Sequence, residues 1–243
     1  MKHCTIYPIP LWISPSDKSH VTYFANLGQP VCVTGYIWYI EGAKEKILVD
    51  SGGDTEHLTR IGLPAHDLQT LESGLNKVGI TVNDVDLIIQ THLHLDHVAF
   101  ASRFPNSRVM VQKRELEFAR NPHPIWEELY DKKLFDNLKF EVIDGDFKIS
   151  EDINVLFTPG HSPGTQSVSV RTDDGIAIIA GLCSILDNYN PPPLPDGKTI
   201  PVIAPAIHTN VFEAYDSLIR IKDLADIILP VHDPAFLTKN VIP

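Results

Sequence analysis

Three short apolar runs in this sequence each lead to a histidine, and that repetition restricts how the chain can fold. The pairs are Val85–Ile89 with His92, Ile153–Phe157 with His161, and Ile227–Val231 with His232. Short branched runs bounded by polar or turn residues are typical of buried β-strands. Side chains that follow such strands lie on loops held by a rigid scaffold, where binding residues concentrate. We therefore expect a sheet-based fold that brings the three strand ends together.

The first of these histidines opens a dense cluster of metal-binding residue types. His92, His94, Asp96 and His97 place three imidazoles and one carboxylate within six residues, and both groups are strong ligands for zinc and related ions. In an extended segment His92 and His94 point to one side. The chain must then turn for Asp96 and His97 to reach a second position. The cluster predicts two adjacent metal sites.

Each predicted site needs a third protein ligand, and His161 and His232 are the obvious donors because each follows a strand. Three protein ligands per ion leave positions for water, as a catalytic site requires and a closed structural site does not. Imidazole and carboxylate groups accept zinc, manganese, iron and cobalt. We expect two divalent ions, with zinc as the first choice.

Composition narrows the class of protein. The 243 residues, of which 43% are hydrophobic, can bury a core as one domain spanning residues 1–243. A formal net charge of -11 argues against a nucleic acid partner, because phosphate neutralisation needs clustered Lys and Arg. Three widely spaced cysteines indicate no disulfide framework, and no apolar run is long enough for a membrane helix. The sequence predicts a cytoplasmic protein without a membrane partner, and it leaves monomer and homodimer open.

Further elements complete the expected fold. Apolar and branched stretches predict strands, and helical spacing of apolar residues predicts helices. Strands are expected at Thr5–Ile9, Val31–Ile40, Lys46–Asp50, Arg108–Gln112, Ser167–Arg171 and Ile176–Ala180, and helices between Pro64 and Gly79, over Lys113–Arg120 and over Val211–Ala225.

With the motif H-x-H-x-D-H at His92–His97, preceded by the strand end Asp50-Ser51-Gly52, the chain resembles the metallo-β-lactamase superfamily over nearly its whole length. The resemblance implies an α/β fold: a four-layer αββα sandwich with two mixed sheets between outer helices and the metals at one edge. It also implies that Asp50 orients metal ligands. His94 stands where the diiron flavoprotein branch has a Glu, which favours hydrolysis over redox chemistry. The spacing from Asp50 to the cluster, the segment Val111–Glu117 and the ending Pro230–Asp233 look most like the N-acyl homoserine lactonase branch.

That branch implies a function. The chain would be a metal-dependent hydrolase of the carboxylic ester class that opens a lactone by attack of a metal-bound hydroxide, an activity known as quorum quenching. Asp96 would be the catalytic residue, passing a proton to the leaving alkoxide. The expected partner is a small-molecule ester or lactone.

The sequence departs from these relatives at two expected positions. Aligning Ala180-Gly181 puts Leu182 where lactonases carry an Asp that bridges both metals. Three possibilities follow: Cys183 ligates as a thiolate, Asp187 reaches back to the metals, or the bridge is missing. Without a bridging carboxylate there is less negative charge between the two cations, so their repulsion is less compensated and the second metal site is expected to be weak. Ile185 stands where a tyrosine polarises the substrate carbonyl. The substrate pocket is expected to include His208, Trp126 and Tyr189, with Tyr189 or Tyr23 as substitutes for that tyrosine.

Other functions share the same ligand cluster. A glyoxalase II-like thioesterase or a β-lactamase would keep all six ligands, but a glutathione thioester would require basic residues where an acyl lactone requires an apolar groove. Apolar residues near Ile125, Trp126 and Leu129 favour the groove. A mononuclear iron dioxygenase and a non-catalytic metal-binding protein are further alternatives. His20 is expected to be a solvated or structural histidine.

Overall fold

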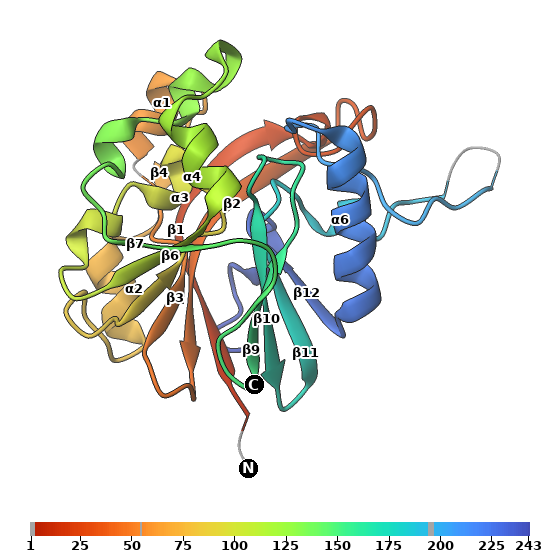
Figure 1. Cartoon of the computed structure of the whole chain (residues 1–243). Helices are drawn as coiled ribbons and strands as arrows, with labels where there is room; N and C mark the ends of the chain where they lie inside the picture. The colour runs from red at the N-terminus through yellow and green to blue at the C-terminus, as the bar shows by residue number, and fades with distance from the viewer. Residues whose placement is uncertain (1–2, 54, 194–196) are drawn as a thin grey trace.

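The fold is built on two β-sheets that pack face to face, as a computed structural model covering residues 3–53, 55–193 and 197–243 shows (Figure 1). The larger sheet has the strand order β4-β1-β2-β3-β5-β6-β7 and the smaller sheet the order β12-β11-β10-β9-β8. The larger sheet consists of β1 (Thr5–Asp17), β2 (Pro30–Glu41), β3 (Ile47–Val49), β4 (His66–Asp67), β5 (Leu87–Ile89), β6 (Arg108–Gln112) and β7 (Phe140–Ile143). The smaller sheet consists of β8 (Phe147–Lys148), β9 (Ile153–Phe157), β10 (Gln166–Thr172), β11 (Gly175–Ala180) and β12 (Ile227–Pro230).

Both sheets are mixed. In the larger one, β1 and β2 form a long antiparallel hairpin, while β3, β5, β6 and β7 run parallel to one another. In the smaller one, β11 and β12 are parallel and the other pairs are antiparallel. Every side chain of Leu87–Ile89 is buried, as expected of a parallel strand covered on both faces. The carboxyl end of this strand leads directly into the histidine cluster.

Helices cover the outer faces of the sheets. The α-helices are α1 (Thr55–Arg60), α2 (Leu71–Lys77), α3 (Leu95–Val98), α4 (Lys113–Arg120), α5 (Leu186–Tyr189) and α6 (Val211–Leu224). Short 3-10 turns are η1 (Lys18–His20), η2 (Ala101–Arg103), η3 (Pro124–Leu129), η4 (Lys132–Leu134) and η5 (Pro234–Phe236). In Figure 1, α6 lies along the smaller sheet on the side away from the larger one.

Of the four hydrophobic clusters among the described residues, three fill the spaces between these layers and the fourth includes Leu116 and Ala119 of α4. The central cluster takes Trp38, Val49 and Ile89 from the larger sheet and Val168 and Ile179 from the smaller one. A second cluster lies between the larger sheet and α2, and a third lies between the smaller sheet and α6. This arrangement of helix, sheet, sheet and helix confirms the predicted four-layer sandwich.

The helix expected between Pro64 and Gly79 is shorter than its spacing suggests. Only Leu71–Lys77 is helical, and the Thr70 side chain caps it by accepting a hydrogen bond from the Ser73 amide at 3.2 Å. His66 and Asp67 instead form β4 beside β1, which leaves Leu68 exposed. The local pattern missed this pairing because the partner strand is far away in the sequence.

The helix at the carboxyl side of the chain agrees in extent with its prediction but differs in its buried face. Phe212 and Tyr215, two of the residues that suggested the helix, are exposed, whereas Ala214, Leu218 and Ile221 pack against the smaller sheet. Within the described residues, no helix is both long and apolar enough to cross a lipid bilayer.

Candidate metal centre

The histidine cluster changes direction at the point where the sequence requires a turn. Thr91 to His94 continue from β5 as an irregular segment, and His94 is the extended residue immediately before α3. Asp96 and His97 therefore lie in a helical turn, from which their side chains approach that of His92. Gly53 makes this turn possible, because a Cβ atom there would lie 2.5 Å from the Cα atom of Asp96.

Two groups of side chains have the geometry to hold a metal ion. Ligand atoms of His92, His94 and His161 all lie within 4.8 Å of one another, and the same is true of His92, Asp96 and His97. The Nε2 atoms of His92 and His161 are 3.1 Å apart. An Asp96 oxygen lies 3.2 Å from His97 Nε2 and 3.7 Å from His232 Nε2, so Asp96 stands between those two imidazoles.

The two distant histidines are aimed inward by backbone carbonyls. The Nδ1 atom of His161 lies 2.8 Å from the carbonyl oxygen of Ile207, and the Nδ1 atom of His232 lies 3.1 Å from that of Thr34. A carbonyl accepts only from a protonated Nδ1, so Nε2 of each neutral ring keeps its lone pair. Both rings present that lone pair to the cluster, as metal-binding histidines do.

Asp50 is buried behind the cluster and orients it. One carboxylate oxygen accepts from the Thr91 amide at 2.7 Å and from Gln90 Nε2 at 3.3 Å, and the other lies 2.7 Å from His97 Nδ1 and 2.9 Å from Thr91 Oγ1. Its backbone has a φ of 60°, an uncommon conformation that Asp tolerates better than most residues. The predicted role of Asp50 in orienting ligands agrees with these contacts.

Electrostatics divides the cluster into two parts. Burial, together with the neighbouring imidazoles, lowers the pKa of His92 and of His94 well below the usual value and that of His161 to about 4. Burial alone would also lower the pKa of His97, but the carboxylates of Asp96 and Asp50 outweigh it and raise that pKa to about 10. The three-histidine group is thus neutral at pH 7, the state that binds metal, whereas His97 must release a proton to bind.

Two buried nitrogen atoms indicate that these residues fit a metal. Within the described part of the chain, Nε2 of His94 has no hydrogen-bond partner, and Nε2 of His97 has only the Asp96 oxygen at 3.2 Å, without hydrogen-bond geometry. A buried polar atom without a partner costs about 1–3 kcal/mol, and coordination of a divalent ion would satisfy both atoms.

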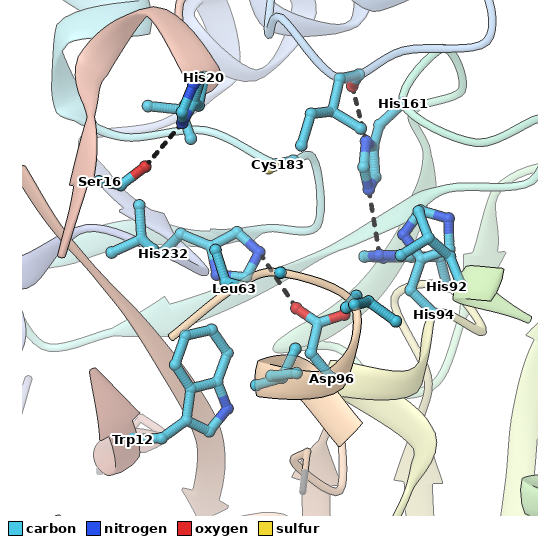
Figure 2. Close-up of a pocket in the computed structure, with 17 residues that line it drawn as sticks. Trp12, Ser16, His20, Leu63, His92, His94, Asp96, His161, Cys183 and His232 are labelled. Carbon is cyan, nitrogen blue, oxygen red and sulfur yellow. Dashed lines mark hydrogen bonds and ion pairs between the residues drawn. The ribbon is translucent and has the colours of Figure 1, made fainter. Parts of the chain in front are cut away.

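The cluster forms one wall of a cavity of about 270 Å³. Figure 2 shows His92, His94 and His161 on one side and His232 on the other, with Asp96 between them and Cys183 above. The remaining wall is mostly apolar. It consists of Trp12, Val21, Val33, Leu58, Ile61, Gly62, Leu63, Leu129 and Ile207, with Ser16 and His20 as polar members.

Of the two residues considered for the bridging position after β11, Cys183 and not Leu182 lies at the cavity wall. Leu182 is fully buried in the cluster beneath α6 and does not line the cavity, whereas Cys183 does. Burial and the nearby charge of Asp96 raise the pKa of the Cys183 thiol. Its sulfur belongs to neither of the two groups able to hold an ion. Asp187, the other candidate bridge, pairs with Lys18 at 2.6 Å.

Four residues expected at the substrate pocket lie outside the cavity lining. Tyr189 does not line the cavity, because it faces the α6 side of the smaller sheet, where its hydroxyl lies 3.3 Å from Ser184 Oγ. His208 and Tyr23 pack against each other at 5.0 Å outside the lining. Trp126 also lies outside the lining, although its ring stacks on that of His94 at 5.8 Å.

Several residues at the site escaped the sequence reasoning. His20, expected to be solvated or structural, lines the cavity, and its Nδ1 lies 3.1 Å from Ser16 Oγ. Trp12 also lines it. Glu115, behind the cluster, is fully buried, and only its place among apolar residues of a predicted helix hinted at burial. None of these has a motif of its own.

Comparison with known proteins agrees with this geometry. The family model described as the metallo-beta-lactamase superfamily matches residues 31–228. An N-acyl homoserine lactonase from Bacillus cereus is 35% identical over 180 residues, which cover 69% of this chain and 70% of the relative. A solved quorum-quenching N-acyl homoserine lactone lactonase has a TM-score of 0.78 at 26% identity, covering 98% of this chain and 95% of its own.

A second solved structure, an N-acyl homoserine lactone hydrolase with the product N-hexanoyl-L-homoserine at its catalytic metal center, has a TM-score of 0.77. It is 25% identical, over 96% of this chain and 95% of its own. A sandwich with this ligand cluster and these relatives leaves one assignment: the chain belongs to the metallo-β-lactamase superfamily, in the family of N-acyl homoserine lactonases.

Proposed function

We propose that this protein hydrolyses N-acyl homoserine lactones, using two divalent metal ions. The observation that carries the proposal is a cavity with two ligand groups on one wall and apolar side chains on the others. The relatives named N-acyl homoserine lactonase support the same substrate class.

The residues proposed to hold the ions are those with suitable geometry. His92, His94 and His161 would hold one ion. Asp96 and His97 would hold the other, with His232 in place of His92 as the third ligand, because His92 would bind the first ion and His232 Nε2 lies 3.7 Å from an Asp96 oxygen. Bound ions of this kind supply a water molecule of lowered pKa and polarise a carbonyl oxygen. Zinc is the proposed metal because neutral imidazole and carboxylate ligands suit it well.

Asp96 is proposed to move the proton during ring opening. Its carboxylate lines the cavity, and although burial opposes ionisation, His97, His232 and His94 lower the pKa of Asp96 and keep it charged. Asp96 would accept a proton from water as the oxygen attacks the carbonyl carbon. It would return that proton to the ring oxygen as the carbon–oxygen bond breaks, giving the open hydroxy acid.

The apolar wall is proposed to hold the acyl chain. Leu58, Leu63, Val21 and Ile207 all line the cavity. Each buried methylene contributes about 0.8 kcal/mol to binding. Among the residues that the structure describes, the lining includes neither Lys nor Arg, so these residues offer no such cation for the carboxylates of a glutathione thioester.

Ser16 and His20 are proposed to bind the amide of the substrate. They are the polar lining residues that lie apart from the ligand groups and Cys183, and in Figure 2 they face the cavity from the side opposite His92 and His94. A lactone bound with its carbonyl at the metal ligands would extend its amide and acyl chain toward that side.

The second ion is proposed to bind more weakly than the first. Leu182 lies in the core, and Cys183 offers a thiol with a raised pKa where a bridging carboxylate was expected. Without that negative charge, the repulsion between two cations is less compensated.

The free state of all three cysteines favours a reducing, cytoplasmic location. The central hydrophobic cluster shared by both sheets supports one domain over residues 1–243.

The first experiment is a comparison of two substrates. Purified protein with its metal content measured by elemental analysis would be assayed by pH-stat with N-hexanoyl homoserine lactone and with S-lactoylglutathione. We expect lactone opening that falls at least about 100-fold in Asp96→Ala and stays unchanged in Asp174→Ala, an exposed control. Thioester hydrolysis without lactone opening, or no turnover by metal-loaded protein, would refute the proposal.

A further inference from the structure

Behind the metal ligands lies a second buried carboxylate, Glu115, which takes no part in the proposed chemistry. It is fully buried in the first turn of α4. Its oxygens accept four hydrogen bonds from neutral donors: the amide of Leu93 at 2.9 Å, the hydroxyl of Tyr130 at 3.0 Å, the hydroxyl of Ser162 at 2.5 Å and the amide of Gly164 at 3.1 Å. Hydrogen bonds to a carboxylate are about twice as strong as those between neutral groups.

The four donors lie next to three metal ligands. Leu93 stands between His92 and His94 in the sequence. Ser162 follows His161 directly, and the ring of Tyr130 packs edge-on against that of His94 at 4.7 Å. One carboxylate therefore joins the loop after β5 to the loop after β9, which are the two loops that form the three-histidine group.

The approach of the second loop to Glu115 is close enough to require glycine. A Cβ atom on Gly164 would lie 2.2 Å from the Glu115 amide nitrogen and 2.4 Å from its Cβ atom. Such distances do not occur between real atoms, so any other residue at 164 would push the loop away. The contact is thus built into the backbone of both segments.

The other ion site depends on a different carboxylate. Asp50 contacts His97 directly through Nδ1, whereas Glu115 bonds to the backbone and hydroxyl groups that flank His92, His94 and His161. Glu115 is thus the carboxylate that bonds to the segments around His92, His94 and His161, whereas Asp50 touches His97 and reaches His92 only through the Thr91 hydroxyl.

We propose that Glu115 is a positioning residue that sets the metal affinity of the three-histidine group, and only of that group. The inference rests on the proposed metal centre but not on the identity of the substrate. Outer partners of metal ligands typically change metal affinity 10- to 100-fold when lost.

Glu115→Gln tests this geometry with almost no change in volume. Each carboxylate oxygen receives one backbone amide, from Leu93 on one side and Gly164 on the other. The Tyr130 and Ser162 hydroxyls can rotate to accept from a glutamine NH₂, but a backbone amide cannot. Whichever way the glutamine side chain turns, one of the two ligand loops loses its anchor.

The two sites can be separated by removing one ligand of each. In a His232→Ala background the three-histidine group stays complete, and in a His161→Ala background Asp96, His97 and His232 stay complete. Metal-free proteins would be titrated with Co²⁺ by calorimetry and by visible absorption. We expect Glu115→Gln to weaken Co²⁺ binding about 10- to 100-fold in the first background, with an altered cobalt spectrum, and to leave binding in the second unchanged.

Two controls lie on the same helix. Glu117→Gln changes an exposed carboxylate and should leave both affinities unchanged. Leu116→Ala removes buried apolar contacts of α4 and should lower the unfolding temperature without changing Co²⁺ affinity, which separates positioning from general destabilisation. If Glu115→Gln fails to fold, Ser162→Ala replaces it and should weaken the same site to a smaller extent.

Several outcomes would overturn the proposal. These are equal weakening in both backgrounds, no weakening in either, or an effect of Leu116→Ala as large as that of Glu115→Gln. The proposed function fails separately: wild-type protein that binds Co²⁺ but opens no lactone would refute the activity while the Glu115 result still stands. Wild-type protein that binds no Co²⁺ would refute both.

Discussion

Replacing Asp50 by asparagine should impair one ion site through a proton rather than through lost packing. Asparagine tolerates the left-handed backbone of this position, where φ is 60°, so the chain path is kept. The side-chain NH₂ must then replace one of two oxygens. One oxygen accepts from the backbone amide of Thr91 at 2.7 Å, and a backbone amide cannot become an acceptor. The NH₂ therefore turns to the other side, toward His97.

An NH₂ group facing His97 Nδ1 reverses the tautomer of the histidine ring. Nδ1 is 2.7 Å from Asp50 in the wild type, where the carboxylate keeps the proton on Nδ1 and leaves Nε2 for the metal. In Asp50→Asn, Nδ1 becomes the acceptor and Nε2 takes the proton. We expect the affinity of the site that contains His97 to fall about 10- to 100-fold, which equals roughly 1.4–2.8 kcal/mol.

The assay is a zinc titration by calorimetry, combined with long-range ¹⁵N–¹H spectra that report which nitrogen of His97 carries the proton. Asp174→Asn, on the exposed hairpin turn, is the matched control. Asp50→Asn protein that binds two zinc ions with wild-type affinity, or that keeps the His97 proton on Nδ1, would contradict this reasoning.

Three further changes test other parts of the site. In metal-free protein the pKa of His161 is lowered to about 4 from its ordinary value of about 6.5. Between pH 6.5 and pH 4 this histidine is therefore protonated in the unfolded chain but neutral in the folded chain, so stability falls as the pH is lowered. Urea unfolding should accordingly show at least about 3 kcal/mol of stability lost between pH 6.5 and pH 4, because the pKa values of His92 and His94 are lowered as well, and a flat profile there would argue against a buried, neutral three-histidine group. Cys183→Asp should restore a negative charge and raise the affinity for the second ion at least about tenfold, since a charge 4 Å from a cation is worth roughly 4 kcal/mol at an effective dielectric constant of 20 before desolvation; equal calorimetric affinity would exclude Cys183 as the missing bridge position. Ser16→Ala and His20→Leu should each raise KM roughly 3- to 10-fold for N-hexanoyl homoserine lactone but not for an alkyl lactone without an amide, and a parallel rise for both substrates would rule out amide recognition.

The sequence predicted the parts of the site that are local. His92, His94, Asp96 and His97 are adjacent in the chain, and their spacing alone required the turn that α3 provides. His161 and His232 were identified because each follows an apolar strand, and those strands occur within a residue or so of the expected bounds.

The parts that the sequence missed depend on contacts between distant segments. Leu182 and Cys183 are neighbours whose side chains face opposite ways, so an alignment shift of one residue exchanges core and cavity. Tyr189 was placed in the pocket by residue type, but its buried helix faces the core. Ser16 and His20 reach the cavity only because the long β1–β2 hairpin brings them there, and no local pattern records that approach.

The origin of the ligands in both sheets has a consequence for how the protein folds. The contact between His232 Nδ1 and the Thr34 carbonyl joins residues 198 positions apart, and contacts of such long sequence separation make folding slow. Until the two sheets assemble, an ion meets only the compact His92–His97 segment, which is available in the unfolded chain as well. Metal bound there stabilises the unfolded ensemble and reduces the benefit of binding to the native state. Refolding in a chelator, with zinc added after the sheets have assembled, should therefore recover more native protein than refolding in excess zinc.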